Sequence, residues 1–151
     1  MMSAVAEHFR IGELARRAGA TPRAVRYYEE LGLLPESGRP RGQHRLYDRH
    51  DEERLKELLR VKETLGLTLS ELRTWSDAEL ARAGLRERWH GGDPADFGAR
   101  SGIALEALEH IETQIALVAA RRAALEEIED ELTGARRRVR DILLRLSEAS
   151  A

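Results

Sequence analysis

The sequence lacks cysteine and has few aromatic residues. With no cysteine among 151 residues, disulfides, thiolate metal sites, iron–sulfur clusters and cysteine nucleophiles are all excluded. Aromatics make up 5% of the chain and charged residues 34%, which is typical of a helix-rich protein rather than a dense enzyme core. The chain also has no Ser-His-Asp arrangement, phosphate-cradling glycine loop or clustered carboxylate pair in a plausible pocket. We therefore expect neither an enzyme nor a bound cofactor.

Long apolar runs are also missing. No segment approaches the roughly 20 consecutive apolar residues that span a bilayer. Residues 1–8 lack the basic, apolar and cleavable arrangement of an export signal. We expect a cytoplasmic protein that has no membrane partner.

The net charge of −2 is small, but the charges are segregated along the chain. Residues 10–50 hold nine arginines and five acids, whereas residues 103–132 hold two arginines and eight acids. A nucleic acid responds to the local field of the surface that faces it. The amino-terminal part is therefore a candidate DNA-binding unit despite the net negative charge.

Two short helices are predicted near the amino terminus. The apolar spacing of residues 11–18 indicates one helix, and Gly19 ends it. Thr21 as N-cap and Pro22 at the first position start a second helix that runs to about Leu31.

The spacing within this pair is typical of a helix-turn-helix. Ala15 allows close approach of the second helix, Gly19 makes the turn, and Val25 closes the small core. The second helix would enter the major groove, with arginines and tyrosine hydroxyls on phosphates. The candidate DNA contacts of this helix are Thr21, Arg23, Arg26, Tyr27 and Tyr28.

The next segment is too rich in proline and glycine for a helix. We expect short strands near Leu33–Leu34 and Arg45–Tyr47, joined as a hairpin. Helices should follow over residues 51–65 and, after Gly66, from a cap at Thr68 or Ser70 to Trp75.

The carboxyl-terminal half is expected to form a long helix. Residues 76–102 form a connecting segment, with a helix ended by Gly91-Gly92-Asp93-Pro94. Residues 103–132 carry apolar side chains at alternating spacings of three and four, which predicts a coiled-coil seam and a second copy to cover it. Residues 133–151 form a short amphipathic tail after Gly134. The predicted seam is Leu108, Ile111, Ile115, Val118, Arg122, Leu125 and Leu132.

Several motifs together resemble the MerR family of transcription regulators. They are the segments 9–15 (Phe-Arg-Ile-Gly-Glu-Leu-Ala), 26–34 (Arg-Tyr-Tyr-Glu-Glu-Leu-Gly-Leu-Leu), 45–47 (Arg-Leu-Tyr) and 65–72 (Leu-Gly-Leu-Thr-Leu-Ser-Glu-Leu). The resemblance covers about residues 9–75. It implies a mainly α fold, with a winged helix-turn-helix head over residues 9–75 and a long helix that forms an antiparallel dimeric coiled coil.

The same resemblance implies how the protein works. The hairpin and the turn at residues 66–68 would be two wings that grip phosphates, with Arg39, Arg41, His44, Arg45 and Tyr47 as first-wing contacts. Family members commonly carry Gly-Tyr where Gln43-His44 stand, so His44 is either a phosphate donor or a solvated loop histidine. A homodimer would bind a palindromic promoter site, distort its spacer for RNA polymerase, and respond to an effector.

Two groups of residues are candidates for binding the signal, one as an effector pocket and one as a metal site. Trp75, Trp89 and Phe97 are the candidate lining of an effector pocket, and their alternative role is to pack the head against the dimer helix. His90, Asp93, Asp96 and His110 are a conceivable metal set, although scattered positions of this kind are usually structural. The alternative to a regulator is a coiled-coil adaptor whose head binds protein.

Overall fold

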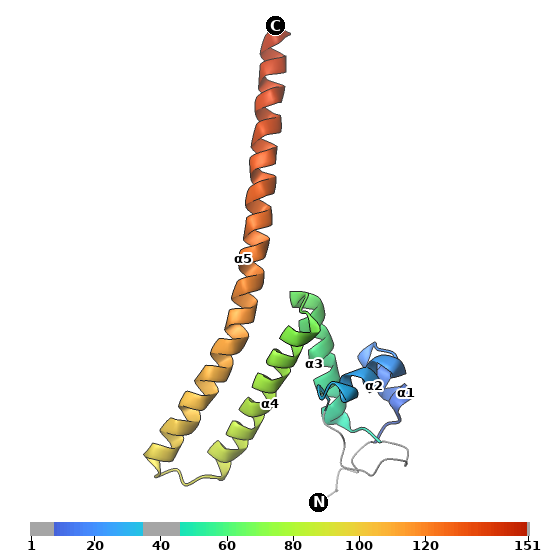
Figure 1. Ribbon diagram of the computed structural model, residues 1–151, viewed down its shortest axis with the longest axis vertical. Coiled ribbons are helices and arrows are strands. Elements are labelled where there is room, and N and C mark those ends of the chain that lie inside the picture. The colour runs from blue at the N-terminus through green and yellow to red at the C-terminus, as the bar shows by residue number, and fades with distance from the viewer. Residues whose placement is uncertain (1–7, 35–45, 151) are drawn as a thin grey trace, which may run out of the picture.

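A computed structural model describes residues 8–34 and 46–150 of the chain. Figure 1 shows helices α1 to α3 gathered in a head, and α4 running beside the first part of a much longer α5. The second half of α5 projects alone. The helices are α1 (Ile11–Ala18), α2 (Pro22–Glu30), α3 (Arg49–Leu65), α4 (Leu69–Gly91) and α5 (Phe97–Ala149).

Side-chain caps start four of these helices, and three of them lie outside the helix-turn-helix pair. Asp48 caps α3 and Thr68 caps α4, each in a capping box with an acid three residues later, and Asp96 caps α5. Thr68 is one of the two caps expected from the sequence. The predicted end near Trp75 is wrong, because α4 continues without a break to Gly91. The head and the connecting segment therefore share one rigid helix.

Helix α5 is longer than the pattern of residues 103–132 predicted. It spans 53 residues and passes through Gly134, where we expected a break. One glycine inside a helix costs only about 1 kcal/mol, and the arginines and leucines that follow are good helix formers. The predicted dimer helix and tail are thus one continuous rod.

The expected strand at Leu33–Leu34 is wrong. Both residues form a bend after α2 and are buried in the core. Tyr47 instead pairs with Phe9 in an isolated antiparallel bridge, with N–H to O distances of 2.7 and 2.8 Å. Within residues 8–34 and 46–150 no longer strand occurs. The rest of the predicted hairpin, including Arg39, Arg41, His44 and Arg45, lies outside the described residues.

One hydrophobic core holds the head together. Leu14 of α1, Val25 of α2 and Leu55 of α3 are fully buried in it, and Leu72 brings in the start of α4. The indole of Trp75 packs against the edge of this core. Burial of these side chains supplies the main driving force for assembling the head.

A buried arginine connects the head to α4. Arg54 Nε donates to the carbonyl of Leu33 at 3.0 Å, and Nη2 donates to Ser76 Oγ at 2.6 Å. Burial lowers the pKa of the Arg54 guanidinium, but arginine remains protonated in proteins. The side chain thus joins the end of α2, helix α3 and helix α4 through charge-assisted hydrogen bonds.

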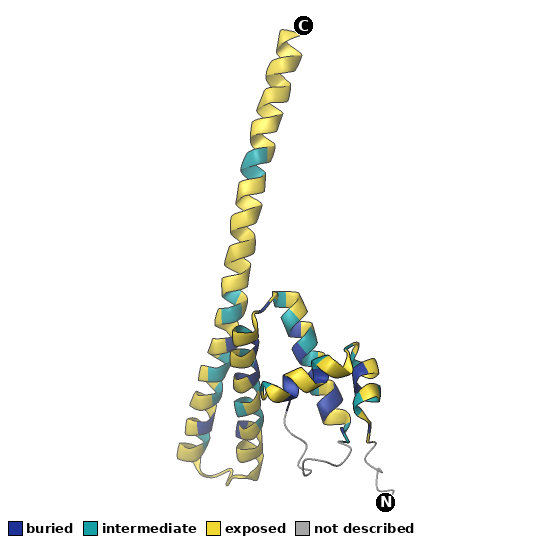
Figure 2. Ribbon diagram, turned by 45° about the vertical axis from the view of Figure 1, so that its right-hand side comes forward, coloured by how far each residue is buried: buried dark blue, intermediate teal, exposed yellow. Residues whose placement is uncertain are grey.

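Helices α4 and α5 pack as a hairpin around a polar clamp. Gln114 of α5 is buried, accepts from Arg82 at 2.7 Å and donates to Glu79 at 3.2 Å. Leu85 of α4 and Ile103 of α5 are buried nearer the turn that joins the two helices. Figure 2 shows that the buried residues of α5 lie along the part that runs beside α4, and that the rest of α5 is almost entirely exposed. In the described part of the chain, no helix is both apolar and long enough to cross a bilayer.

Replacing Arg54 with alanine should lower the free energy of unfolding by about 2–3 kcal/mol, because Ser76 and the Leu33 carbonyl lose their buried donor. Urea denaturation measures this loss. Arg60→Ala is the matched control, since Arg60 pairs with Glu57 at 2.6 Å on the surface and should cost under about 0.5 kcal/mol. Equal losses for both variants would show that Arg54 does not tie α4 to the head.

Candidate nucleic-acid interface

Helices α1 and α2 form the helix-turn-helix predicted from the sequence. Gly19 ends α1 with φ +70°, in the left-handed region, and Ala20 N–H donates to Ala15 O at 2.8 Å. Thr21 Oγ1 then accepts from Ala24 N–H at 3.1 Å to start α2. Ala15 and Val25 are both buried at the helix crossing. The predicted roles of the small residue, the turn and the closing residue are confirmed.

The outer face of α2 is cationic. Arg23 and Arg26 are exposed, and Tyr27 keeps 44% of its surface open to solvent. Val25 and Tyr28 face the core, so the helical period places these three side chains outward. Among the described residues, neither Arg23 nor Arg26 has an ion-pair partner. Their charges are therefore available to an external anion.

Arg17 of α1 has a different environment. Its guanidinium contacts Glu13 at 3.1 Å and Glu52 at 3.5 Å, and lies 3.9 Å from the centre of the Phe9 ring. These contacts hold the bridge segment at Phe9 against α1 and α3. In the sequence, the only signal for this role is the four-residue spacing of Glu13 and Arg17, which allows an ion pair on one helix face.

Tyr28 and Tyr47 lie in the core, with 4% and 2% of their surfaces exposed. The rings therefore pack the head, and Lys62 Nζ lies 3.4 Å from the Tyr28 hydroxyl. The phosphate contacts predicted for both residues stay predictions, and only the hydroxyl groups could make them. The three-residue spacing of Val25 and Tyr28 is compatible with both side chains facing α1, but spacing does not show how completely the Tyr28 ring is buried.

The turn between α3 and α4 holds the segment for which the resemblance implies a second wing, and that role stays a prediction. Gly66 has φ +59°, and Thr68 caps the next helix. A hydrogen bond from the Thr68 backbone lowers the pKa of the Glu71 carboxyl. The guanidinium of Arg121, on α5, lies 3.1 Å from where a Cβ on Gly66 would stand. The turn thus lies against the long helix.

The three aromatic residues of the candidate effector pocket are not brought together. Trp75 packs on the head core, and Phe97 is 80% exposed at the start of α5. Trp89 alone lines a groove of about 270 Å³ between α4 and α5, whose other walls include Leu85, Ile103 and Ala107. Arg100 stacks on the Trp89 ring at 3.8 Å.

The conceivable metal residues are dispersed. His90 lies at the end of α4, Asp93 and Asp96 in the turn, and His110 within α5. Across residues 8–34 and 46–150, no three His, Cys, Asp or Glu side chains are grouped so that they could hold a metal ion.

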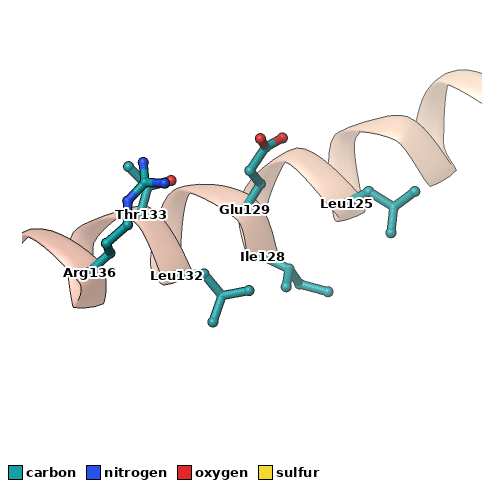
Figure 3. A pocket seen from close by; sticks show the side chains of 6 residues that line it. All are labelled: Leu125, Ile128, Glu129, Leu132, Thr133 and Arg136. Carbon is teal, nitrogen blue, oxygen red and sulfur yellow. The ribbon is translucent and has the colours of Figure 1, made fainter.

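Most of the predicted seam is open on the single chain. Leu108, Ile115, Val118, Arg122, Leu125 and Leu132 are exposed, and Ile111 is half-buried at the groove. Figure 3 shows Leu125, Ile128 and Leu132 projecting to one side of α5. Burial of these apolar side chains requires another helix.

Replacing Gly19 with alanine should lower the free energy of unfolding by about 1–2 kcal/mol, because a Cβ is disfavoured at positive φ. Thermal unfolding followed by circular dichroism tests this. The control is Gly12→Ala, inside α1 with nothing within 4 Å of a Cβ, which should be neutral or stabilising by a few tenths of a kcal/mol. A neutral Gly19→Ala would contradict the assigned turn.

Comparison with known proteins agrees with this geometry. Residues 9–79 match the MerR HTH family regulatory proteins. The chain is 44% identical over 66 residues to the HTH-type transcriptional regulator YfmP of Bacillus subtilis, covering 44% of this chain and 47% of that one. It is 45% identical over 64 residues to the mercuric resistance operon regulatory protein of Bacillus cereus, covering 42% and 48% of the two chains. These two matches span about half the length of each relative.

A longer similarity exists to the HTH-type transcriptional regulator ZntR of Escherichia coli. It is 32% identical over 126 residues, covering 83% of this chain and 82% of that one. Among solved structures, the transcription regulator PbrR691 from Ralstonia metallidurans in complex with lead(II) is 33% identical with a TM-score of 0.47, covering 85% and 86% of the chains. Because the similarity to ZntR runs along most of both chains, this chain belongs to the MerR family of helix-turn-helix regulators.

Proposed function

We propose that this protein is a sequence-specific DNA-binding transcription regulator that acts as a homodimer on a palindromic promoter site. The observation that carries the proposal is the outer face of α2, where Arg23 and Arg26 are exposed on a helix-turn-helix frame and have no ion-pair partner within residues 8–34 and 46–150. Arg23, near the amino end of α2, would contact base edges, and Arg26 and Tyr27 would contact phosphates. The relatives named as transcriptional regulators support this function.

Two copies would present two recognition helices. The exposed seam on α5 supports a homodimer, because a single helix cannot bury its own apolar face. Two-fold symmetry then requires a palindromic site. By family analogy, the dimer distorts the promoter spacer so that RNA polymerase can use it. Bending a site of this kind costs several kcal/mol by elastic estimates, which phosphate contacts from two heads would offset.

A small-molecule effector would bind in the groove between α4 and α5. The groove that Trp89 lines has mostly apolar walls, and Arg82 and Arg86 stand at its edge. An apolar ligand with an anionic group suits these walls. Trp75 and Phe97 do not line this groove, so we propose neither as an effector contact.

Replacing Arg26 with alanine should weaken binding to the preferred duplex roughly tenfold. It should also lower the number of counterions released on binding by about one for each bound chain, because each chain loses one phosphate contact. Fluorescence anisotropy over a range of salt concentrations measures both effects. Arg88→Ala is the control, because Arg88 pairs with Glu106 at 2.8 Å on the α4–α5 hairpin. A protein-binding adaptor would instead show weak duplex affinity with little salt dependence in every variant.

Replacing Leu125 with aspartate should convert the dimer to monomer and abolish operator binding, because two carboxylates would be buried where α5 meets its copy. Sedimentation velocity measures the mass. Leu125 is exposed on the single chain, so the head should keep its unfolding midpoint. A monomer that bound duplex with undiminished affinity would refute the dimeric mechanism.

A further inference from the structure

The polar cluster beside the α4–α5 groove holds more positive than negative charge. Arg82 and Arg86 both line the groove. Arg82 Nη1 lies 3.1 Å from Glu79 Oε2, and Arg86 Nη2 lies 3.8 Å from Glu79 Oε1. Within residues 8–34 and 46–150, neither arginine has a second acidic partner. Two guanidinium groups therefore share one carboxylate, and the cluster keeps one positive charge.

The two arginines differ in how firmly they are held. Arg82 also donates to Gln114 Oε1 at 2.7 Å, and its side chain is 29% exposed. The Arg86 side chain is 57% exposed, and its contact with Glu79 is longer than a hydrogen bond. An exposed ion pair of this length contributes little stability. Arg86 can therefore exchange Glu79 for another anion at little cost, whereas Arg82 cannot.

Glu79 links both arginines to the clamp between the two helices. Its Oε2 atom accepts from Arg82 and, at 3.2 Å, from Nε2 of Gln114, which is buried on α5. Its Oε1 atom faces Arg86. A competing anion on Arg86 would leave the Glu79 carboxylate entirely to Arg82 and Gln114.

Building on the effector groove of the proposed function, we propose that Arg86 binds the carboxylate of an amphiphilic effector and that this binding strengthens the Gln114 clamp. The apolar body of the ligand would lie against Leu85, Trp89 and Ile103. Its carboxylate would replace Glu79 as the partner of Arg86 through charge-assisted hydrogen bonds. Glu79 would then hold α5 to α4 without the opposing attraction of Arg86.

The dimensions and charge of the groove restrict the ligand class. Its volume of about 270 Å³ is small for a ligand site. Arg100 adds a second cation where its guanidinium stacks on the Trp89 ring at 3.8 Å. A cationic ligand would face both Arg86 and Arg100, and a second anionic group would lie against apolar walls. A compact monocarboxylate suits the groove best.

The clamp lies close to the contact between α5 and the head. Gln114 precedes Arg121 by seven residues on α5, which is about two helical turns. Arg121 contacts the turn at Gly66. A ligand that tightens the clamp would therefore act on the segment of α5 that touches the head.

Nuclear magnetic resonance with cyclohexanecarboxylate and its neutral analogue cyclohexanecarboxamide tests the binding. The chain has two tryptophans and hence two indole N–H signals. The carboxylate should shift the signal of Trp89, which lines the groove, and leave that of Trp75, which packs on the head core. The carboxamide should bind roughly tenfold more weakly. Equal affinities for the two compounds, or an unshifted Trp89 signal, would overturn the proposal.

Replacing Arg86 with glutamine should weaken binding of the carboxylate roughly tenfold and leave binding of the carboxamide unchanged, because only the carboxylate needs the cation. Titrations of the Trp89 signal measure both affinities. Arg88→Gln is the matched control, since Arg88 lies on the same helix, pairs with Glu106 at 2.8 Å and does not line the groove. Equal losses in the two variants would refute the role of Arg86.

The side-chain amide of Gln114 reports on the clamp directly. The chain has two glutamines and no asparagine, so its side-chain amide signals come from two residues, and Gln43→Ala shows which pair belongs to Gln114. The carboxylate should slow exchange of the Gln114 amide protons with water roughly threefold, because their hydrogen bond to Glu79 strengthens. Exchange should stay unchanged with the carboxamide and in Arg86→Gln. Unchanged exchange at saturating carboxylate would overturn the coupling.

Binding to duplex DNA separates this proposal from the proposed regulator. Fluorescence anisotropy without ligand measures the function of α2 alone. A protein that binds its duplex but shows neither the Trp89 shift nor the Gln114 response would overturn the effector mechanism and leave the regulator standing. A protein that gives both responses but binds no duplex would overturn the regulator instead.

Discussion

The structure depends on one constraint, which is that a single long helix cannot bury its own apolar face. Helix α5 spans 53 residues and carries such a face from Leu108 to Leu132, and α4 covers only its first part. The proposed homodimer supplies a second helix to cover the part of α5 beyond the α4–α5 hairpin. The proposed pairing of two recognition helices, and with it a palindromic site, follows from this requirement.

Rigid connections make such a dimer useful for reading DNA. Arg54 ties the head to α4 through Leu33 and Ser76, and the Gln114 clamp ties α4 to α5. Arg121 brings α5 against the turn at Gly66. Because these contacts join α2 to the long helix, the distance between two recognition helices would be set by the pairing of the two α5 helices. A ligand in the α4–α5 groove would then act on the part of the molecule that controls this distance.

Local signals made the helix-turn-helix predictable. Gly19, Thr21 and Pro22 determine a turn and a helix start from their own backbone preferences, and the structure agrees at each. The family resemblance was equally accessible, because its motifs are contiguous in sequence. The seam on α5 was predicted from spacing alone; most of its side chains are exposed on the single chain, and its pairing with a second copy stays a prediction.

Features that depend on tertiary context were harder to predict. Leu33 and Leu34 look like a strand by composition but are drawn into the core, and Tyr47 pairs with Phe9 instead. Gly134 resembles a helix end in the sequence. One glycine destabilises a helix only slightly, however, and the high helix propensity of its neighbours outweighs that cost. The roles of Arg54 and Gln114 carry no local signal, because their partners are more than twenty residues away in sequence. Trp75, Trp89 and Phe97 were grouped by residue type, which says nothing about where their helices place them.

Selection of bound sequences from a random pool of duplexes tests the central claim most directly. If two copies of α2 bind DNA together at a separation fixed by α5, the recovered sequences should converge on an inverted repeat with one spacing between half-sites. Recovery of a single half-site, of repeats with variable spacing, or of no enriched sequence at low ionic strength would contradict it.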